Sequence, residues 1–446
     1  MNSHFSRRTF LYHLGRTGLS LPFINGLTSA KFDGDSIVLS QNGCGRATGY
    51  AEANKIISAA GKTFFSWLES EDGKFAVFVR SFDHKSQKLS KSIRIGDAHD
   101  NHGGPALTID RDGFLHIVYF PHHHPMRYRK ALAPYSIERW EEESSFGVRT
   151  TYPTLTCGPD NNLYCTVRES DDSAPWEVHL YRKSNGAPWH LSRKLMKSRF
   201  NGYSHFQESM SWSPGDQTLH LLCRFHEGSD GNAYGRLQTV AYMQSADLGE
   251  TWHKLDGKVI ETPAEVESLD VLAKGGEDYG ILLRTGGMSV DNFGIPHLIY
   301  SEQEGLSGKC FLVVALKNGT WRYTLLNDFL PQWFKSWMLT MPGGISFDQQ
   351  NNMYIVAQIK RMEEGEKYWG HPTNEVVLLY SEDGGDSFTF ELLSELKSDE
   401  AHWLPNIERN TGHNFIESRP WLMYTSGAPG RNNQDILENK VMASRL

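Results

Sequence analysis

The chain has 446 residues, a formal net charge of −8 at pH 7, 22% charged residues, 12% aromatic residues and 41 glycines. A chain of this length would ordinarily divide into two or three domains, although repeat folds remain single at this size. The acidic balance excludes a nucleic-acid partner that depends on a broad basic surface. No segment after the N-terminus approaches the ~20 apolar residues of a membrane helix, so we expect no membrane partner either.

The first 30 residues resemble an export signal. The sequence SRRTFL starts at Ser6 and precedes a weakly apolar segment, which is the pattern of a twin-arginine signal. Cleavage is expected near Ala30, followed by a location in the periplasm or the medium. A disordered basic tail is the alternative interpretation of residues 1–30.

Seven segments of the remaining chain repeat one pattern. Most follow a turn rich in Gly, Asp or Asn, and each continues as a short run of β-branched and aromatic residues, which favours a strand. The intervals between them vary, which is typical of long loops on a constant framework. The segments begin at Gly61, Asp112, Asn161, Gln217, Glu277, Asn351 and Arg419.

Further strands flank these runs. PALTID from Pro105, PTLTCG from Pro153 and GISFDQ from Gly344 come before three of them. Hairpins that end in an aromatic residue come after several, and two of these, from Ser245 and Ser381, resemble the Asp-box turn of sialidase-like propellers. In that turn the polar side chains satisfy turn amides while the aromatic side chain packs inward, so we expect a structural role.

These repeats predict an all-β fold, a seven-bladed β-propeller, with residues 31–446 as a single domain. The C-terminal KVMASRL has the pattern of a late strand in the last blade, and SIVLS from Ser36 could pair there and close the ring. A two-sheet sandwich is the alternative, but it predicts less even repetition.

The five cysteines are odd in number and widely spaced, so they do not predict a disulfide framework. Cys157 and Cys165 lie near one hairpin and could pair. Buried free thiols are the expectation for all five.

Histidines cluster around the second repeat. The first two strands of a propeller blade form an antiparallel hairpin, so the start of the first strand lies beside the end of the second. His102 precedes the first strand, and His122, His123 and His124 follow the second. The two groups are therefore predicted to meet at one rim of the disc. A structural role for each histidine is the alternative.

The third repeat adds Tyr152 before its first strand and Arg168 at the end of its second. Alignment of the second strands places Arg224 and Arg284 at positions equivalent to Arg168, and strand alternation puts His226 on the same face. Imidazoles, a phenol and guanidiniums on one rim suit a ligand with carboxylate or sulfate groups. Ion pairs between blades are the alternative role for these arginines.

Three parts of the chain are similar to the β-propeller ulvan lyases of polysaccharide lyase families 24 and 25. They are NHGGPALTIDRDGFLHIVYFPHHH from Asn101, TTYPTLTCGPDNNLYCTVRES from Thr150, and the Asp-box hairpins. The resemblance runs from residue 42 to the C-terminus and is strongest over 97–170. It implies an enzyme that cleaves ulvan, a sulfated, rhamnose-rich algal polysaccharide, at the bond to a uronic acid by β-elimination.

The resemblance also implies roles for individual residues. Catalytic positions match His102, His122, Tyr152 and Arg168, the last of which neutralises the uronate carboxylate. His123 or His124 takes the place of His122 if the register slips. Tyr203 is matched to a further tyrosine on the substrate side. His123 and the two arginines from the strand alignment, Arg224 and Arg284, are the other expected substrate-binding side chains.

The implied chemistry explains these residue types. Removal of the C5 proton beside an ionised carboxylate is difficult, and a paired Arg makes that proton more acidic. A base takes the proton while an acid protonates the departing O4. We predict His102 and Tyr152 as this pair, in an order that the sequence leaves open, because the C5 proton lies on opposite faces in glucuronate and iduronate. His122 is expected to orient the carboxylate or to support Arg168.

The resemblance implies a structural metal but no catalytic cofactor. The nearest soft-ligand cluster is His205, Cys223 and His226, which predicts zinc there, with calcium as the alternative ion. Strand alternation puts Cys223 and His226 on opposite faces unless the strand has already ended. The expected partner is an anionic polysaccharide, ulvan, bound by a monomer.

Two other functions remain open. A sialidase-like exo-glycosidase would use Asp boxes and three arginines, but hydrolysis needs rim carboxylates, for which Glu169 and Glu208 are the candidates. A propeller that binds polysaccharide without catalysis is the other.

Overall fold

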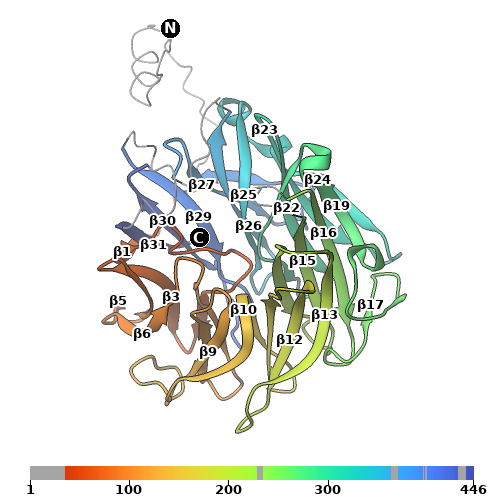
Figure 1. Cartoon of the computed structure of the whole chain (residues 1–446). Helices are drawn as coiled ribbons and strands as arrows, with labels where there is room; N and C mark the ends of the chain where they lie inside the picture. Colours follow the sequence, from red (N-terminus) through yellow and green to blue (C-terminus); the bar gives the residue numbers. More distant parts are fainter. Residues whose placement is uncertain (1–35, 229–234, 363–369, 395, 397–398, 430–437) are drawn as a thin grey trace, which may run out of the picture.

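The computed structural model describes residues 36–228, 235–362, 370–394, 396, 399–429 and 438–446. The predicted signal at residues 1–30 lies outside these ranges. The described chain is all-β, with 31 strands in five sheets (Figure 1). Its helices are four short 3-10 turns, none long and apolar enough to cross a membrane. They are η1 (Val266–Ser268), η2 (Glu277–Tyr279), η3 (Leu326–Phe329) and η4 (Gln332–Phe334).

Neighbouring strands in the sheets pair antiparallel. The first sheet has the order β29 (Ala401–Ile407), β30 (Trp421–Gly427), β31 (Asn439–Arg445), β1 (Ile37–Gly43), β3 (Lys62–Glu71), β4 (Lys74–Asp83) and β5 (Lys88–Leu89), with β2 (Ile56–Ala59) on β3 and β6 (Ile93–Ala98) on β4. The second has the order β13 (His190–Asn201), β12 (Pro175–Lys183), β11 (Leu163–Glu169), β10 (Ser144–Cys157), β9 (His124–Lys130), β8 (Leu115–Tyr119) and β7 (Ala106–Ile109).

The other three sheets follow along the chain. The third has the order β14 (His205–Trp212), β15 (Leu219–Glu227), β16 (Leu237–Ser245), β17 (Trp252–His253) and β18 (Val259–Ile260), with β19 (Asp270–Gly275) on β16. The fourth is β20 (Leu282–Thr285), β22 (Pro296–Glu304), β23 (Ser307–Ala315) and β24 (Trp321–Leu325), with β21 (Ser289–Val290) on β22. The fifth is β25 (Trp337–Phe347), β26 (Met353–Arg361), β27 (Glu375–Ser381) and β28 (Thr389–Leu392).

The first and last described strands belong to one sheet. Strand β1 pairs antiparallel with β31, where Val38 lies opposite Met442 (Figure 1). The pairing predicted between SIVLS and KVMASRL is therefore confirmed. It ties the two ends of the described chain together.

The hydrophobic core lies between neighbouring sheets. Leu68 of β3 and Ile117 of β8 share one buried cluster, and Leu180 of β12 and Leu221 of β15 share another. Each such leucine stabilises the fold by roughly 1.5–3 kcal/mol when it leaves water. All five cysteines are buried and free, so the expectation of buried free thiols is confirmed.

Strand β10 belongs to two hairpins. Its first half pairs with β9, where Phe146 lies opposite Met126, and its second half pairs with β11, where Leu155 lies opposite Cys165. The register shifts between Thr151 and Thr154. Tyr152 lies in this bend with φ 55, a left-handed conformation that few non-glycine residues adopt. The bend turns the phenol out of the regular side-chain alternation.

One predicted equivalence is wrong. Arg168 and Arg224 lie on β11 and β15, which each have two strand neighbours, but Arg284 lies on β20, the edge of its sheet. The repeat that begins at Glu277 predicts the second strand of a blade, but the second strand of this sheet is β22. The physical reason is the turn that Gly276 and Ile281 close through backbone hydrogen bonds, which lets only a short strand begin there.

The two Asp-box hairpins have the predicted structural role. Asp247 accepts hydrogen bonds from the backbone N–H of Thr251 at 2.8 Å and from its hydroxyl at 2.6 Å. Trp252 is buried behind the turn, and its indole N–H donates to the Gly249 carbonyl. Asp383 makes the same backbone contact with Ser387 at 2.9 Å.

We expect Asp247→Ala to lower the free energy of unfolding by about 2 kcal/mol, because it leaves turn donors without acceptors. Urea denaturation of the variant and wild type measures this. Asp278→Ala is the matched control, since Asp278 makes only an exposed ion pair with Arg236. Equal stability of both variants would contradict the structural role.

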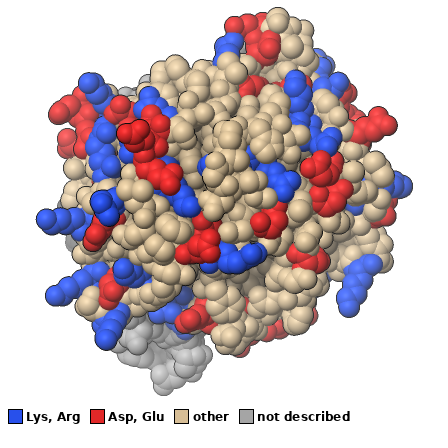
Figure 2. All heavy atoms as spheres, turned by 90° about the horizontal axis from the view of Figure 1, so that it is seen from below, with Lys and Arg blue, Asp and Glu red and all other residues tan. Residues whose placement is uncertain are grey.

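Charges of both signs are interspersed over the surface. On the face drawn in Figure 2, Lys and Arg side chains alternate with Asp and Glu, with no broad region of one sign. That face offers no continuous basic surface for nucleic acid.

Candidate active site

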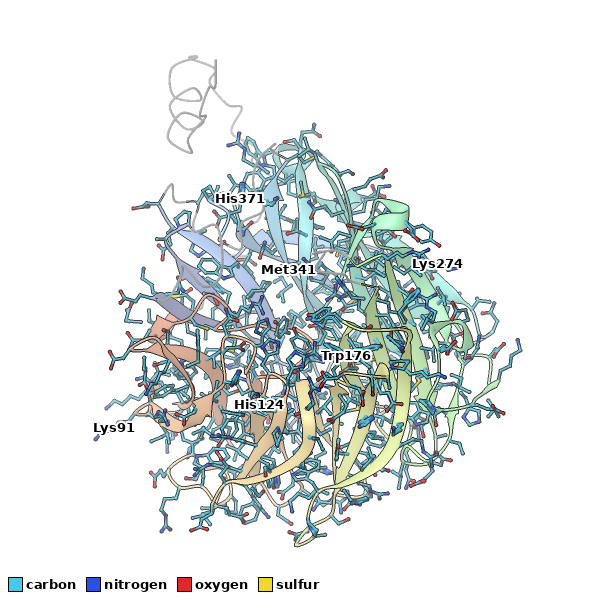
Figure 3. All side chains as sticks on the ribbon, viewed as in Figure 1. Lys91, His124, Trp176, Lys274, Met341 and His371 are labelled. Atoms are coloured by element: carbon cyan, nitrogen blue, oxygen red, sulfur yellow. The ribbon has the colours of Figure 1, made fainter. Side chains whose placement is uncertain are left out.

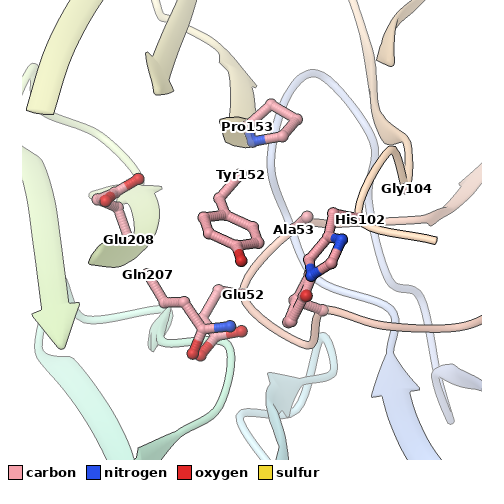
Figure 4. A pocket seen from close by; sticks show the side chains of 9 residues that line it. Glu52, Ala53, His102, Gly104, Tyr152, Pro153, Gln207 and Glu208 are labelled. Atoms are coloured by element: carbon pink, nitrogen blue, oxygen red, sulfur yellow. The ribbon is translucent and has the colours of Figure 1, made fainter. Parts of the chain in front are cut away.

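A narrow hollow opens where the first three sheets approach the segment between β1 and β2 (Figure 4). Its walls come from that segment, from the loop before β7, from the bend of β10 and from the start of β14. The lining residues are Tyr50, Glu52, Ala53, His102, Gly104, Tyr152, Pro153, Gln207 and Glu208. Figure 3 shows the nearby His124 and Trp176 in the middle of the strand array, far from Lys91 and Lys274 at its edge.

The two groups of histidines meet as predicted. The rings of His102 and His122 stack with centroids 4.1 Å apart. His123 lies 4.6 Å from His122 and bonds through Nδ1 to the Ser170 hydroxyl at 2.7 Å. His124 instead stacks on His99 at 4.1 Å, so it does not replace His122 beside His102.

Asp100 holds both stacked imidazoles. One carboxylate oxygen lies 3.0 Å from Nδ1 of His102, and the other lies 2.6 Å from Nδ1 of His122. A carboxylate only accepts, so each neutral ring carries its proton on Nδ1 and leaves a lone pair on Nε2. Although burial opposes it, hydrogen bonds from both histidines hold the pKa of Asp100 well below its usual range.

Burial lowers the pKa of His102 to about 4, although Asp100 opposes the shift. His102 is therefore an unprotonated base at neutral pH. Burial has the opposite effect on Tyr152, whose pKa is raised, so its hydroxyl keeps its proton. The ring centroids of the two residues are 6.2 Å apart. One hollow thus holds an unprotonated imidazole and a protonated phenol.

Arg168 is fully buried next to Tyr152, with its guanidinium carbon 4.8 Å from the phenol ring and 4.8 Å from Trp176. Its Nη2 donates to Thr151 Oγ1 at 2.8 Å and lies 3.3 Å from His123 Nε2. Its Nε and Nη1 have no partner among the described residues. A buried charge with idle donors is costly unless an anion completes it. Arg168 is therefore a buried cation with two unsatisfied donors beside Tyr152.

The other predicted binding residues, Tyr203, Arg224 and Arg284, lie near Arg168 or next to one another. Tyr203 is 41% exposed and lies over Arg168, with its ring 5.9 Å from the guanidinium carbon. Arg224 is buried and donates to the Leu283 carbonyl at 3.1 Å and to the Gln207 side chain. Arg284 follows Leu283, so the edge strand brings it to the same neighbourhood in spite of its different place in the sheet.

The two carboxylates considered for hydrolysis, Glu169 and Glu208, lie in different places. Glu208 lines the hollow, and burial beside Glu52 raises its pKa to about 8. Glu169 instead accepts the backbone N–H of Arg149 at 2.5 Å and does not line the hollow.

The predicted metal ligands do not come together. His205 and His226 pair across β14 and β15 with ring centroids 5.9 Å apart, whereas Cys223 packs in the hydrophobic cluster of Leu221. Strand β15 continues through Cys223 and His226, so alternation points them to opposite faces. In the described ranges, only Asp100, His102 and His122 bring three ligand atoms within 4.8 Å of one another, and their nitrogens contact the carboxylate directly.

Several site residues escaped the sequence reasoning. Asp100 lies two residues before His102, and that spacing is a usable signal for a carboxylate that orients a histidine. Tyr50 and Glu52 come from the irregular segment between β1 and β2, where no strand pattern marks a position. Arg46 donates to the Tyr50 hydroxyl at 2.5 Å and belongs to the same segment.

The fold and site define an all-β repeat protein with Asp-box hairpins and a buried guanidinium beside a base and an acid. A family model described as "BNR repeat-containing family member" matches residues 62–329, more than half of the chain. The chain belongs to this BNR repeat-containing family.

Individual relatives are more distant. The chain is 22% identical over 286 residues to an ulvan lyase of Alteromonas sp. (strain LOR), covering 54% of this chain and 57% of that one. It is 21% identical over 296 residues to "Ulvan Lyase-PL25" of Pseudoalteromonas sp. (strain PLSV), covering 58% and 59%. The match thus spans less than two thirds of these relatives.

Solved structures resemble the whole fold. A polysaccharide lyase of family PL25, an ulvan lyase, superposes with a TM-score of 0.66 at 14% identity, over 92% of this chain and 95% of that one. The same family bound to -[GlcA(1-4)Rha3S]- gives 0.65, also at 14% identity and over 92% and 95%. The polysaccharide lyase Uly1 gives 0.61 at 14% identity, over 92% and 98%. At this identity the likeness concerns the fold.

Proposed function

We propose that this chain is a polysaccharide lyase that cleaves ulvan at a uronic acid by β-elimination. The observation that carries the proposal is the buried, incompletely paired guanidinium of Arg168, which lies beside the protonated phenol of Tyr152, with the neutral imidazole of His102 on the same hollow. The relatives and solved structures named as ulvan lyases support the same substrate.

In the proposed reaction Arg168 receives the uronate carboxylate on an unpartnered donor of its guanidinium. The guanidinium draws charge from the carboxylate and makes the C5 proton more acidic. Because Arg168 is buried beneath Tyr203 and Trp176, the exposed Tyr203 ring has to move aside for the carboxylate. Tyr203 then becomes a wall of the sugar site.

His102 is the proposed base and Tyr152 the proposed acid. Nε2 of His102 takes the C5 proton, the electron pair of that bond forms the C4–C5 double bond, and the C4–O4 bond breaks. The Tyr152 hydroxyl gives its proton to the departing O4. The depressed pKa of His102 and the raised pKa of Tyr152 favour this order over the reverse. Asp100 and His122 hold the base in place.

The remaining expectations complete the proposal. We propose that the five sheets make up seven four-stranded blades of one propeller, because β10 and the β1–β3 pairing each join two blade-sized groups of strands. We also propose export through the signal at residues 1–30, to the periplasm or the medium, and action as a monomer. A structural metal is not part of the proposal, because the predicted ligands lie apart.

A glycoside hydrolase is the second candidate, and Glu208 favours it. This carboxyl shares the hollow with Tyr152, and its raised pKa suits a general acid. Hydrolysis needs a second, ionised carboxylate, and burial also raises the pKa of Glu52, the other acid in the hollow. The charge states therefore favour the lyase.

Digestion of purified ulvan tests the proposal. A lyase leaves an unsaturated uronyl end that absorbs ultraviolet light, whereas a hydrolase releases reducing ends without that absorbance. A binding protein leaves the polymer intact. Shortening of the polymer without new absorbance would overturn the lyase in favour of the hydrolase.

We expect Asp100→Asn to lower kcat about tenfold or more, because the amide no longer fixes the proton of His102 on Nδ1. In wild type the Asp100 carboxylate partly offsets the effect of burial on the pKa of His102, which is about 4, so the acid limb of kcat/KM is expected near pH 4. Without the carboxylate the pKa of His102 falls further, and the acid limb moves to lower pH. A base is active above its pKa, which sets this direction. A pH profile of ulvan cleavage measures both effects, with Asp97→Asn as the control because Asp97 is exposed. An acid limb that moves upward would contradict the assignment.

A further inference from the structure

We propose that a second anion-binding subsite lies around Arg284, His226 and His205 and takes a sulfate ester of the polysaccharide. This inference rests on the proposed ulvan lyase function and adds the residues that recognise sulfation. The site is distinct from Arg168, which receives the carboxylate.

The protonation of His226 is fixed by its neighbour Gln238. The Gln238 carbonyl oxygen accepts the backbone N–H of Leu283 at 2.6 Å, so its amide nitrogen is the atom that lies 3.2 Å from Nδ1 of His226. An amide nitrogen donates, and Nδ1 must therefore accept. The proton of the neutral ring is then on Nε2, which is buried and has no partner among the described residues. His226 thus presents an idle N–H donor.

Other buried nitrogens without a partner lie near His226. Nε2 of His205 is buried and unpartnered, and the two histidines face each other across β14 and β15. Arg224 uses Nη1 and Nη2 in hydrogen bonds, but its Nε is also buried without a partner. Three unpaired buried nitrogens in one neighbourhood each carry a desolvation cost that an acceptor would remove.

Arg284 supplies a further charge. It is half-buried, and burial and then the Arg224 charge lower its pKa to about 9, so it stays charged at neutral pH without a hydrogen bond or ion pair to the described residues. Leu283, the preceding residue, is tied to Arg224 through its carbonyl and to Gln238 through its N–H. The nearest acid is Glu52, whose carboxylate accepts the Thr285 hydroxyl at 2.7 Å. The single carboxylate of Glu52 therefore interacts with two guanidiniums, those of Arg224 and Arg284.

This balance of charge favours an anion and disfavours a metal ion. Burial and then the Arg224 charge lower the pKa of His226 to about 3, so the ring already resists a further positive charge. A sulfate ester stays ionised at every relevant pH, and its oxygens accept from several directions, as these donors require. Tyr203 lies between the two anion sites, with its ring 6.4 Å from His226 and 5.9 Å from the Arg168 carbon. A uronate at Arg168 would place a sulfated neighbouring sugar at Arg284.

Kinetics and calorimetry with native and chemically desulfated ulvan test the subsite. For wild type we expect KM and Kd at least tenfold higher with the desulfated polymer. In Arg284→Ala the KM and Kd for native ulvan should rise toward the values for desulfated ulvan, so that the ratio between the two polymers falls toward one. His226→Gln should give an intermediate loss and Arg284→Lys a partial recovery. Thermal melting checks that each variant folds.

The controls separate the possible outcomes. Arg322→Ala removes an arginine from the outer strand β24, where it pairs with Asp386, and should leave the preference for sulfation unchanged. Equal losses of Arg284→Ala on both polymers, or a wild type without preference, would overturn the subsite. Inhibition by sodium sulfate at constant ionic strength that depends on Arg284, without any preference between polymers, would assign the site to free sulfate and also overturn it. Binding calorimetry distinguishes these outcomes even if wild type forms no unsaturated product. That result would contradict the proposed lyase activity but not the sulfate subsite.

Discussion

Replacement of Tyr152 by phenylalanine is expected to lower kcat on ulvan about 100- to 10,000-fold, the range that a general acid contributes. The phenylalanine keeps the ring that packs against Tyr50 and His205, at 5.0 and 4.4 Å, and removes only the hydroxyl that we propose as the proton donor to O4. Ulvan binding should therefore survive. Steady-state kinetics and calorimetry on the same preparation measure the two effects separately.

His102→Ala is the companion variant, because it removes the proposed base. Both variants should melt within a few degrees of wild type, and neither should form the unsaturated product at more than a tenth of the wild-type rate. Retention of more than a tenth of the activity in both would refute the pair. Tyr279→Phe, at an exposed tyrosine outside the hollow, serves as the control for loss of a phenol.

Removal of the guanidinium in Arg168→Ala should cost at least about 3 kcal/mol of transition-state stabilisation, measured as the ratio of kcat/KM values. The cost arises because the uronate carboxylate keeps its full charge and the C5 proton stays weakly acidic. Arg168→Lys should recover only part of this loss, since an ammonium is a compact point charge without the planar set of donors of the guanidinium.

A stability measurement separates this role from packing. Arg168 is buried without a carboxylate partner, so Arg168→Met should unfold at the same urea concentration as wild type or a higher one. If Arg168 serves catalysis at a cost in stability, its replacement should lower kcat/KM without lowering the free energy of unfolding. A strongly destabilised Arg168→Met with near-normal kcat/KM would show that Arg168 is structural.

Much of the site could be predicted from strand order alone. The hairpin rule places His102 beside His122 because the ends of two antiparallel neighbours share a rim, and the structure stacks the rings at 4.1 Å. The same rule brings Tyr152 to Arg168. These predictions held because they needed only the direction of each strand and the two-residue alternation along it.

Predictions that depended on a strand's place within its sheet, or on segments without a strand pattern, were wrong or missing. Arg284 was aligned through a run of apolar residues, but the turn at Gly276 makes its strand an edge, which no short pattern reveals. Cys223 and His226 were grouped by spacing, whereas the unbroken strand β15 turns them apart. Tyr50 and Glu52 reach the hollow from a segment whose path depends on long-range contacts, such as the bond from Thr48 to the Leu404 carbonyl.

The bend of β10 has a consequence for directed evolution. Tyr152 holds a left-handed backbone that costs a residue with a β-carbon about 1–3 kcal/mol and costs glycine almost nothing. The buried ring of Tyr152 contributes about 3–5 kcal/mol, which outweighs that strain, so glycine is not the expected replacement. A library randomised at this codon and sorted only for heat resistance should therefore keep an aromatic ring and accept phenylalanine as readily as tyrosine. The same library sorted for turnover should return tyrosine alone, because only the phenol carries the proposed proton donor.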